Sequence, residues 1–166
     1  MSRAWPPPGR VLGFHPSAHG FGWVVFDGLF KPLDWGLVSA RADKNATCLR
    51  RLEGLLDRFT PETLVLEAFD RQSSRRARRI TQLCLAVRRA ADTRAIETAV
   101  YNRADILSAF AEVKARTRRD IAEAVARHLE VFRHRLPPPR RPWDSEDARS
   151  ALFAAAAVVL THQRLG

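Results

Sequence analysis

Residues 10–26 read RVLGFHPSAHGFGWVVF and contain two short apolar runs separated by a break. The runs at 10–14 and 21–26 are rich in the aromatic and β-branched residues that are typical of strands. The break, HPS at 15–17, predicts the end of the first strand. A third strand is predicted over residues 33–40. We therefore expect the fold to begin with an antiparallel meander of three strands.

Helices and two further strands are predicted after the meander. Apolar residues recur at three- and four-residue spacing between Leu49 and Phe59, which predicts a helix over 44–59. The run TLVLE at 63–67 predicts a short buried strand that ends at Glu67. The other predicted elements are a helix over 73–92, a strand over 95–101, helices over 103–110 and 117–131, an irregular segment at 133–142 and a last helix over 144–165. This order predicts an α/β fold, with a mixed sheet and helices on both faces. We expect residues 1–9 to be a proline-rich lead-in and residues 10–166 to form a single domain.

The charge of the chain favours a polyanionic partner. Lys and Arg total 28 against 18 Asp and Glu in 166 residues, a net charge of +10, and all but three of the basic residues are arginines. Arginine binds phosphate through a planar fork of donors. A genome rich in G and C, which encodes Arg in place of Lys, is the alternative explanation.

The sequence predicts a protein of the reducing cytoplasm. Cys48 and Cys84 are too few for a disulfide scaffold in a domain of this size. The N-terminal residues contain no apolar signal core, and the longest apolar run, at 151–160, is about half as long as a membrane span. We therefore expect a cytoplasmic location.

Three acidic residues are candidates for a metal site. Glu67 ends a buried strand, where α/β folds bind ligands. Asp144 and Asp147 are three residues apart at the start of a predicted helix, so both carboxylates would share one face. Ordinary acidity at a helix N-terminus, or a solvated or paired strand-end acid, is the alternative for each residue alone. Together they predict a site for Mg²⁺ or Mn²⁺, and two such ions are the clamp used for phosphodiester cleavage.

The order of these motifs resembles that of the RuvC-type Holliday junction resolvases, members of the RNase H-like nuclease superfamily. The first strand and turn, Gly13-Phe14-His15-Pro16-Ser17, and the following Gly20-Phe21-Gly22-Trp23-Val24 match the start of that family. Val65-Leu66-Glu67 matches its fourth strand, and Asp144-Ser145-Glu146-Asp147-Ala148 matches the start of its last helix. The resemblance implies an RNase H-like fold with a five-stranded mixed sheet flanked by α-helices on both faces.

The resemblance also implies a function. Members of the family are homodimeric endonucleases that cut four-way DNA junctions with Mg²⁺ and four acidic residues. Glu67, Asp144 and Asp147 correspond to three of these residues, which makes them candidate catalytic and metal-binding residues. A nuclease that acts on structured RNA is an alternative, since RNase H-like relatives also act on RNA.

His15 stands where the family has its first catalytic Asp. An imidazole offers one nitrogen and no negative charge, and it suits Mn²⁺ better than Mg²⁺. We expect weaker binding of the two ions, with Mn²⁺ preferred. Three interpretations follow: an active nuclease with His15 as an altered ligand, an inactive protein that binds branched DNA, or rescue by another acid such as Asp27 or Asp70. His19 is expected to lie on the surface.

Basic and aromatic residues around the acidic motifs are candidates for nucleic-acid binding. Phe69, two residues after Glu67, is a candidate wedge for the junction centre or a core residue. Three arginine-rich clusters flank the acidic motifs, as expected for phosphate contacts that position a duplex. They are Arg71, Arg75, Arg76, Arg78 and Arg79; then Lys114, Arg116, Arg118 and Arg119; and finally Arg140 and Arg141.

Overall fold

Five strands form one mixed sheet in the computed structural model, which describes residues 9–68, 75–139, 141 and 147–165. The strands are β1 (Arg10–Pro16), β2 (Gly20–Asp27), β3 (Pro32–Ser39), β4 (Thr63–Glu67) and β5 (Glu97–Tyr101). Their order is β3-β2-β1-β4-β5. The first three are antiparallel, whereas β4 pairs in parallel with both β1 and β5. The predicted meander and the predicted mixed sheet are both confirmed.

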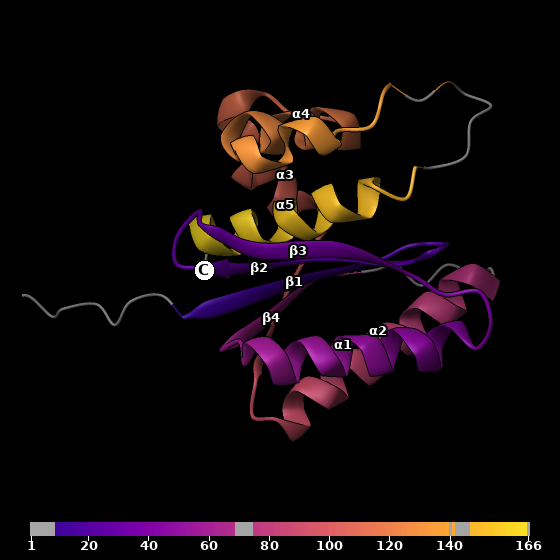
Figure 1. Cartoon of the computed structure of the whole chain (residues 1–166). Coiled ribbons are helices and arrows are strands. Elements are labelled where there is room, and N and C mark those ends of the chain that lie inside the picture. The colour runs from indigo at the N-terminus through magenta and orange to yellow at the C-terminus, as the bar shows by residue number, and fades with distance from the viewer. Residues whose placement is uncertain (1–8, 69–74, 140, 142–146, 166) are drawn as a thin grey trace, which may run out of the picture.

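Helices cover both faces of this sheet, as the sequence predicted (Figure 1). On one face lie α1 (Lys44–Phe59) and α2 (Arg75–Thr93). On the other face lie α3 (Arg103–Ala109), α4 (Arg118–His128) and α5 (Ser150–Leu165). Two 3₁₀ turns, η1 (Ala111–Val113) and η2 (Glu130–Arg135), follow α3 and α4.

Successive strand residues point to opposite faces of the sheet, and this alternation divides the core in two. Leu12 and Phe14 of β1 belong to the cluster on the side of α1 and α2. Val11 of β1 and Val65 of β4 belong to the cluster on the side of α5. Residues that follow Val11 and Val65 at even spacing, His15 and Glu67 among them, therefore face the side of α3, α4 and α5.

The helix α5 is the centre of that second layer. Its residues from Ala151 to Thr161 are buried apart from Ala154, because the helix has the sheet on one side and α3 and α4 on the other. Glycines let it approach the sheet closely. A Cβ at Gly22 would lie 2.5 Å from the carbonyl oxygen of Ala151 and 2.6 Å from the amide nitrogen of Leu152. A Cβ at Gly13 would lie 2.5 Å from the carbonyl oxygen of Ala155.

Capping boxes fix the first residues of α3 and α4. In α3 the Asn102 side chain accepts a hydrogen bond from the amide of Asp105 at 2.8 Å, and the Asp105 carboxylate accepts one from the amide of Asn102 at 2.9 Å. Thr117 and Asp120 make the same pair of bonds in α4, at 3.0 and 3.2 Å. Both helices therefore begin at a defined residue, Arg103 in α3 and Arg118 in α4.

Two predicted boundaries next to the acidic motifs were wrong. The strand β1 does not stop at residue 14 but continues through His15 to Pro16. Proline is tolerated there because the pairing with β4 ends at Phe14, so that this part of β1 is an edge that pairs with β2 alone. The last helix starts at Ser150 and not at residue 144. The Asp147 carboxylate accepts a hydrogen bond from the amide of Arg149 at 2.9 Å, a local turn that competes with helix geometry.

Other predicted boundaries differ less from the observed ones. The helix predicted over 117–131 ends at His128, and η2 extends to Arg135 inside the segment predicted to be irregular. Phe132 of η2 is fully buried, so its packing accounts for this extra turn. The strand predicted over 95–101 begins at Glu97, because Ala95 has a left-handed backbone with φ of 56°. Within the described residues, none of the helices is both long and apolar enough to span a bilayer.

Substitution of Gly22 by Ala is expected to destabilise the protein by about 1–3 kcal/mol, because the new methyl group would meet the backbone of α5 and force it outward. Urea denaturation would measure the change. Gly54→Ala in α1 is the control: a Cβ there meets nothing within 4 Å, and the loss of a helical glycine should stabilise the protein by about 1 kcal/mol. Equal effects of the two substitutions would contradict the close approach of α5.

Candidate active site

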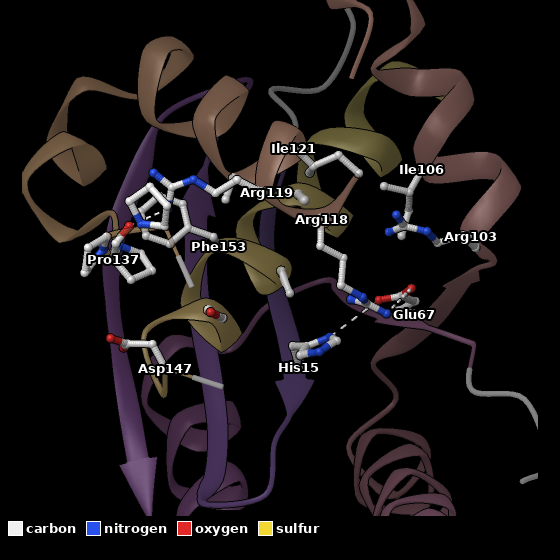
Figure 2. Close-up of a pocket in the computed structure, with 16 residues that line it drawn as sticks. His15, Glu67, Arg103, Ile106, Arg118, Arg119, Ile121, Pro137, Asp147 and Phe153 are labelled. Atoms are coloured by element: carbon white, nitrogen blue, oxygen red, sulfur yellow. Dashed lines mark hydrogen bonds and ion pairs between the residues drawn. The ribbon is translucent and has the colours of Figure 1, made fainter. Parts of the chain in front are cut away.

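His15 and Glu67 meet at one end of the sheet. They directly follow Phe14 and Leu66, the last residues at which β1 and β4 pair in parallel. Both side chains point to the α5 side of the sheet and line a cavity of about 410 Å³ (Figure 2). The cavity is bounded by α3, α4, α5 and residues 137–139. It is therefore a strand-end pocket of the kind in which α/β folds bind ligands.

The two oxygens of the Glu67 carboxylate have different neighbours. His15 Nδ1 lies 3.6 Å from Oε2, and Arg118 Nη2 lies 3.6 Å from Oε1. Glu67 and His15 are only 7% and 8% exposed, whereas the Arg118 side chain is 58% exposed. Figure 2 shows Arg118 reaching down from α4 toward Glu67, with His15 on the other side of that contact.

Burial controls the protonation of both groups. It raises the pKa of Glu67, while the positive charges of Arg118 and Arg103 act in the opposite direction. Burial and the charge of Arg118 lower the pKa of His15 from 6.5 to about 3. His15 is therefore a neutral imidazole at physiological pH, and its contact with Glu67 is not an attraction between opposite charges.

Asp147 lines the same pocket but is not on a helix. Its carboxylate is held by Arg149, with Oδ2 2.8 Å from Nη2 and Oδ1 3.0 Å from Nε. Hydrogen bonds from the Arg149 side chain hold the pKa of Asp147 below its usual range. The predicted shared helix face of Asp144 and Asp147 is therefore wrong for Asp147, and Asp144 lies outside the described residues.

Two of the predicted arginines line the pocket, and they have different surroundings. Arg118 faces Glu67, as described above. Arg119 instead donates to the Glu123 carboxylate at 2.9 Å and to the carbonyl oxygen of Pro137. Arg119 therefore ties the proline segment to α4, and these two bonds hold its guanidinium away from Glu67.

Sequence reasoning missed Arg103, which also lines the pocket. It is the first residue of α3, two residues after β5 ends at Tyr101. Since β5 runs parallel to β4, with Tyr101 opposite Glu67, the start of α3 has to lie near Glu67. No pairing between β4 and β5 was predicted from the sequence, and Arg103 belongs to no arginine cluster, so neither signal pointed to it.

The other predicted nucleic-acid contacts lie around the pocket or outside the described residues. Arg79 is committed to the fold, because it donates to the carbonyl oxygen of Ser17 at 3.1 Å and to the Asn45 side chain at 3.4 Å. Those on the surface, which do not line the pocket, are Arg78, Lys114, Arg116 and Arg141. Those outside the described residues are Phe69, Arg71 and Arg140, together with the side chains of Arg75 and Arg76.

The acids considered as replacements for the missing Asp do not reach His15 in the described part of the chain. Asp27 pairs with Arg10 in the β1–β2 register, at the end of the sheet opposite His15. Its carboxylate lies 3.8 Å from the guanidinium of Arg10. Asp70 lies outside the described residues. His19 is exposed and does not line the pocket, which agrees with the surface position expected for it.

The pocket fits one divalent ion better than two. His15 Nδ1 and Glu67 Oε2 offer one nitrogen and one oxygen, 3.6 Å apart. Two protein donors of this kind, completed by water and a substrate phosphate, are enough for one ion. The described residues contain no group of three His, Cys, Asp or Glu side chains placed to hold a metal. Donors for a second ion are therefore not assembled within them.

Comparison with known proteins identifies the fold. No protein-family model matches the sequence, and no curated protein sequence matches it significantly. Among solved structures, RuvC of Thermus thermophilus bound to a Holliday junction substrate matches with a TM-score of 0.68. The match has 20% sequence identity and covers 92% of this chain and 91% of that chain. This chain has the RuvC fold.

A second structure of Thermus thermophilus RuvC matches equally well, with a TM-score of 0.67, 20% identity and 92% of each chain covered. The α/β fold with a five-stranded mixed sheet, which the resemblance to RuvC implied, is thereby confirmed. The structural neighbours of the chain are RuvC Holliday junction resolvases.

The buried, neutral state of His15 predicts a pH dependence of stability. Its pKa is about 3 in the folded protein and 6.5, the ordinary value of histidine, in the unfolded chain, so below pH 6.5 the unfolded state binds a proton that the folded state does not. The free energy of unfolding should therefore fall as the pH falls. Between pH 7 and pH 5 the wild type should lose about 2 kcal/mol more than His15→Asn, which does not titrate.

Urea denaturation at both pH values, in a chelating buffer, would measure this difference. Glu67 titrates in both proteins, so its contribution largely cancels in the comparison. Parallel pH profiles for the wild type and His15→Asn would mean that His15 is not held neutral by burial.

Proposed function

We propose that this chain is a structure-selective endonuclease that resolves branched DNA. In this proposal residues 10–166 form a single RuvC-like nuclease domain, which works as a homodimer on a four-way junction. The catalytic and metal-binding residues are His15, Glu67, Asp144 and Asp147.

The observation that carries the proposal is the shared pocket of His15, Glu67 and Asp147 in a RuvC fold. These side chains come from β1, β4 and the segment before α5, which are distant in the sequence. The resemblance matches four residues of this chain to the family's catalytic positions, and the three of them that lie within the described residues all line one cavity. A buried carboxylate is costly unless a cation lies nearby, so the position of Glu67 in this pocket favours a cation-binding role.

The arginines beside the pocket supply the affinity for DNA. Arg118 and Arg103 place positive charge next to Glu67, where a phosphodiester would enter. Lys114 and Arg116 are exposed at the start of α4, and the net charge of +10 favours a polyanion. Contacts of this kind position a duplex without reading its sequence.

The reaction is hydrolysis of a phosphodiester bond. A water oxygen adds to phosphorus, one P–O ester bond breaks, and the departing oxygen takes up a proton that the water has lost. Glu67 and His15 would hold the ion, and Asp147 and Asp144 would complete the acidic side of the pocket. A bound Mn²⁺ or Mg²⁺ ion supplies a water of lowered pKa and neutralises charge on the phosphate. The nitrogen of His15 favours Mn²⁺ over Mg²⁺.

A protein that binds branched DNA without cutting it is the second candidate. Two features favour it. His15, which the resemblance matches to the family's first Asp, is a neutral imidazole, and the adjacent Glu67 already has a cation, Arg118, at 3.6 Å. Such a site has less attraction for divalent ions. The two candidates share the pocket and the arginines and differ only in cleavage.

Cleavage of a labelled four-way junction decides between them. The wild type should nick the junction in Mn²⁺, less well in Mg²⁺, and leave a linear duplex of the same sequence intact. Glu67→Gln should lower the cleavage rate by at least about 1,000-fold, since it removes a charged ligand, while junction binding is largely retained.

The control variant is Glu112→Gln, an exposed carboxylate outside the pocket, which should cut like the wild type. Undiminished cutting by Glu67→Gln would overturn the assignment of the site. Tight junction binding with no cleavage in either metal would establish the second candidate instead.

Junction binding should weaken steeply with salt, because each neutralised phosphate releases counterions. Replacing both Lys114 and Arg116 by Ala should lower the slope of log K against log[salt] by about 1–2. Arg51→Ala, an exposed arginine on α1 across the sheet from the pocket, should leave the slope unchanged. Equal slopes for all three proteins would contradict the proposed phosphate contacts.

A further inference from the structure

Arg118 lies beside Glu67. In a site built from four carboxylates, a divalent ion would be needed at this place to neutralise their charge. We propose that the guanidinium of Arg118 replaces one of the two divalent ions of the site, so that each pocket binds a single ion. This inference rests on the proposed function, because it concerns the cations of the same pocket.

The charges of the pocket support the replacement. Among the described residues that line it, Glu67 and Asp147 carry negative charge, whereas Arg103, Arg118 and Arg119 carry positive charge. Two divalent ions would add four positive charges to a pocket whose described carboxylates are already matched by arginines. One divalent ion together with a guanidinium gives the pocket a smaller excess of positive charge.

The geometry of Glu67 supports it as well. The His15 side of the carboxylate, at Oε2, provides a nitrogen and an oxygen that suit an ion. The other oxygen, Oε1, faces Arg118 at 3.6 Å. An ion on that side would have to displace the guanidinium. The two oxygens therefore serve two different cations.

The position of Arg118 is built into the fold. It is the first residue of α4 and lies inside the capping box, directly after Thr117 and two residues before Asp120. A cation at a helix N-terminus is disfavoured by the helix dipole, so its placement there needs nearby anions. Glu67 is one, and a phosphate of the DNA would be another, which the planar guanidinium could hold through paired hydrogen bonds.

Two substitutions together should restore the binding of a second divalent ion. Arg118→Ala removes the guanidinium, and His15→Asp restores a carboxylate where the family has one. In the full-length protein, titration with Mn²⁺ followed by the EPR signal of the free ion counts bound ions without any need for cleavage. Circular dichroism of each variant verifies folding, and Arg118→Gln is a second variant that keeps a polar side chain.

The wild type should bind one Mn²⁺ per chain. Arg118→Ala and Arg118→Gln should bind it about tenfold more tightly, because a nearby positive charge is gone. The double variant, His15→Asp with Arg118→Ala, should bind two. Arg51→Ala, which removes an exposed arginine on α1 across the sheet from the pocket, should match the wild type. Glu67→Gln should lose the ion.

Other outcomes overturn the inference in distinguishable ways. Two ions on the wild type would refute the replacement and leave the proposed nuclease intact. An unchanged Mn²⁺ affinity in both Arg118 variants, or one ion on the double variant, would show that Arg118 does not occupy an ion's place. Mn²⁺ binding by none of the proteins would refute the inference too, and junction cleavage would then decide the proposed function by itself.

Discussion

The pocket depends on the parallel pairing of β1 with β4. Because the two strands run in the same direction and Phe14 lies beside Leu66, His15 and Glu67 emerge at one end and on one face of the sheet. A shift of one residue in this register would turn Glu67 toward α1 and α2. The hydrophobic cluster on that side of the sheet has no place for a carboxylate. The hydrophobic alternation of both strands therefore fixes the chemistry at their ends.

The helices around the site have different roles. The buried helix α5 lies against Gly13 and Gly22, so it forms a floor that cannot move far relative to β1 and β2. The start of α3 and the start of α4 each bring an arginine to Glu67, and each start is set by a capping box. A strand-end acid, a rigid helix and two capped helices thus define the pocket, although their residues are scattered over the sequence.

Much of this could be predicted from the sequence, because the signals were local. The apolar runs gave the strands, and the strand-end position of Glu67 placed it at the ligand end of the sheet. Asp147 was misplaced because its side chain binds the amide and guanidinium of Arg149, a turn that helical spacing does not reveal. Arg103 was missed because its role comes from the pairing of β5 with β4, a contact distant in sequence. The neutral state of His15 could not be predicted, since it follows from burial by three elements at once.

Arg118 and Arg119 are chemically identical neighbours, yet the fold separates them. Successive residues of a helix are turned by about 100°, so Arg118 faces Glu67 while Arg119 turns to Glu123 and Pro137. The position of the capping residue Thr117 thereby determines the direction in which each residue of α4 points. Deleting one residue from the loop before Thr117 could be absorbed by that loop, whereas moving the threonine itself by one position would exchange the two arginines. The composition and net charge of the chain would stay the same, but Arg119 would then face Glu67 in place of Arg118.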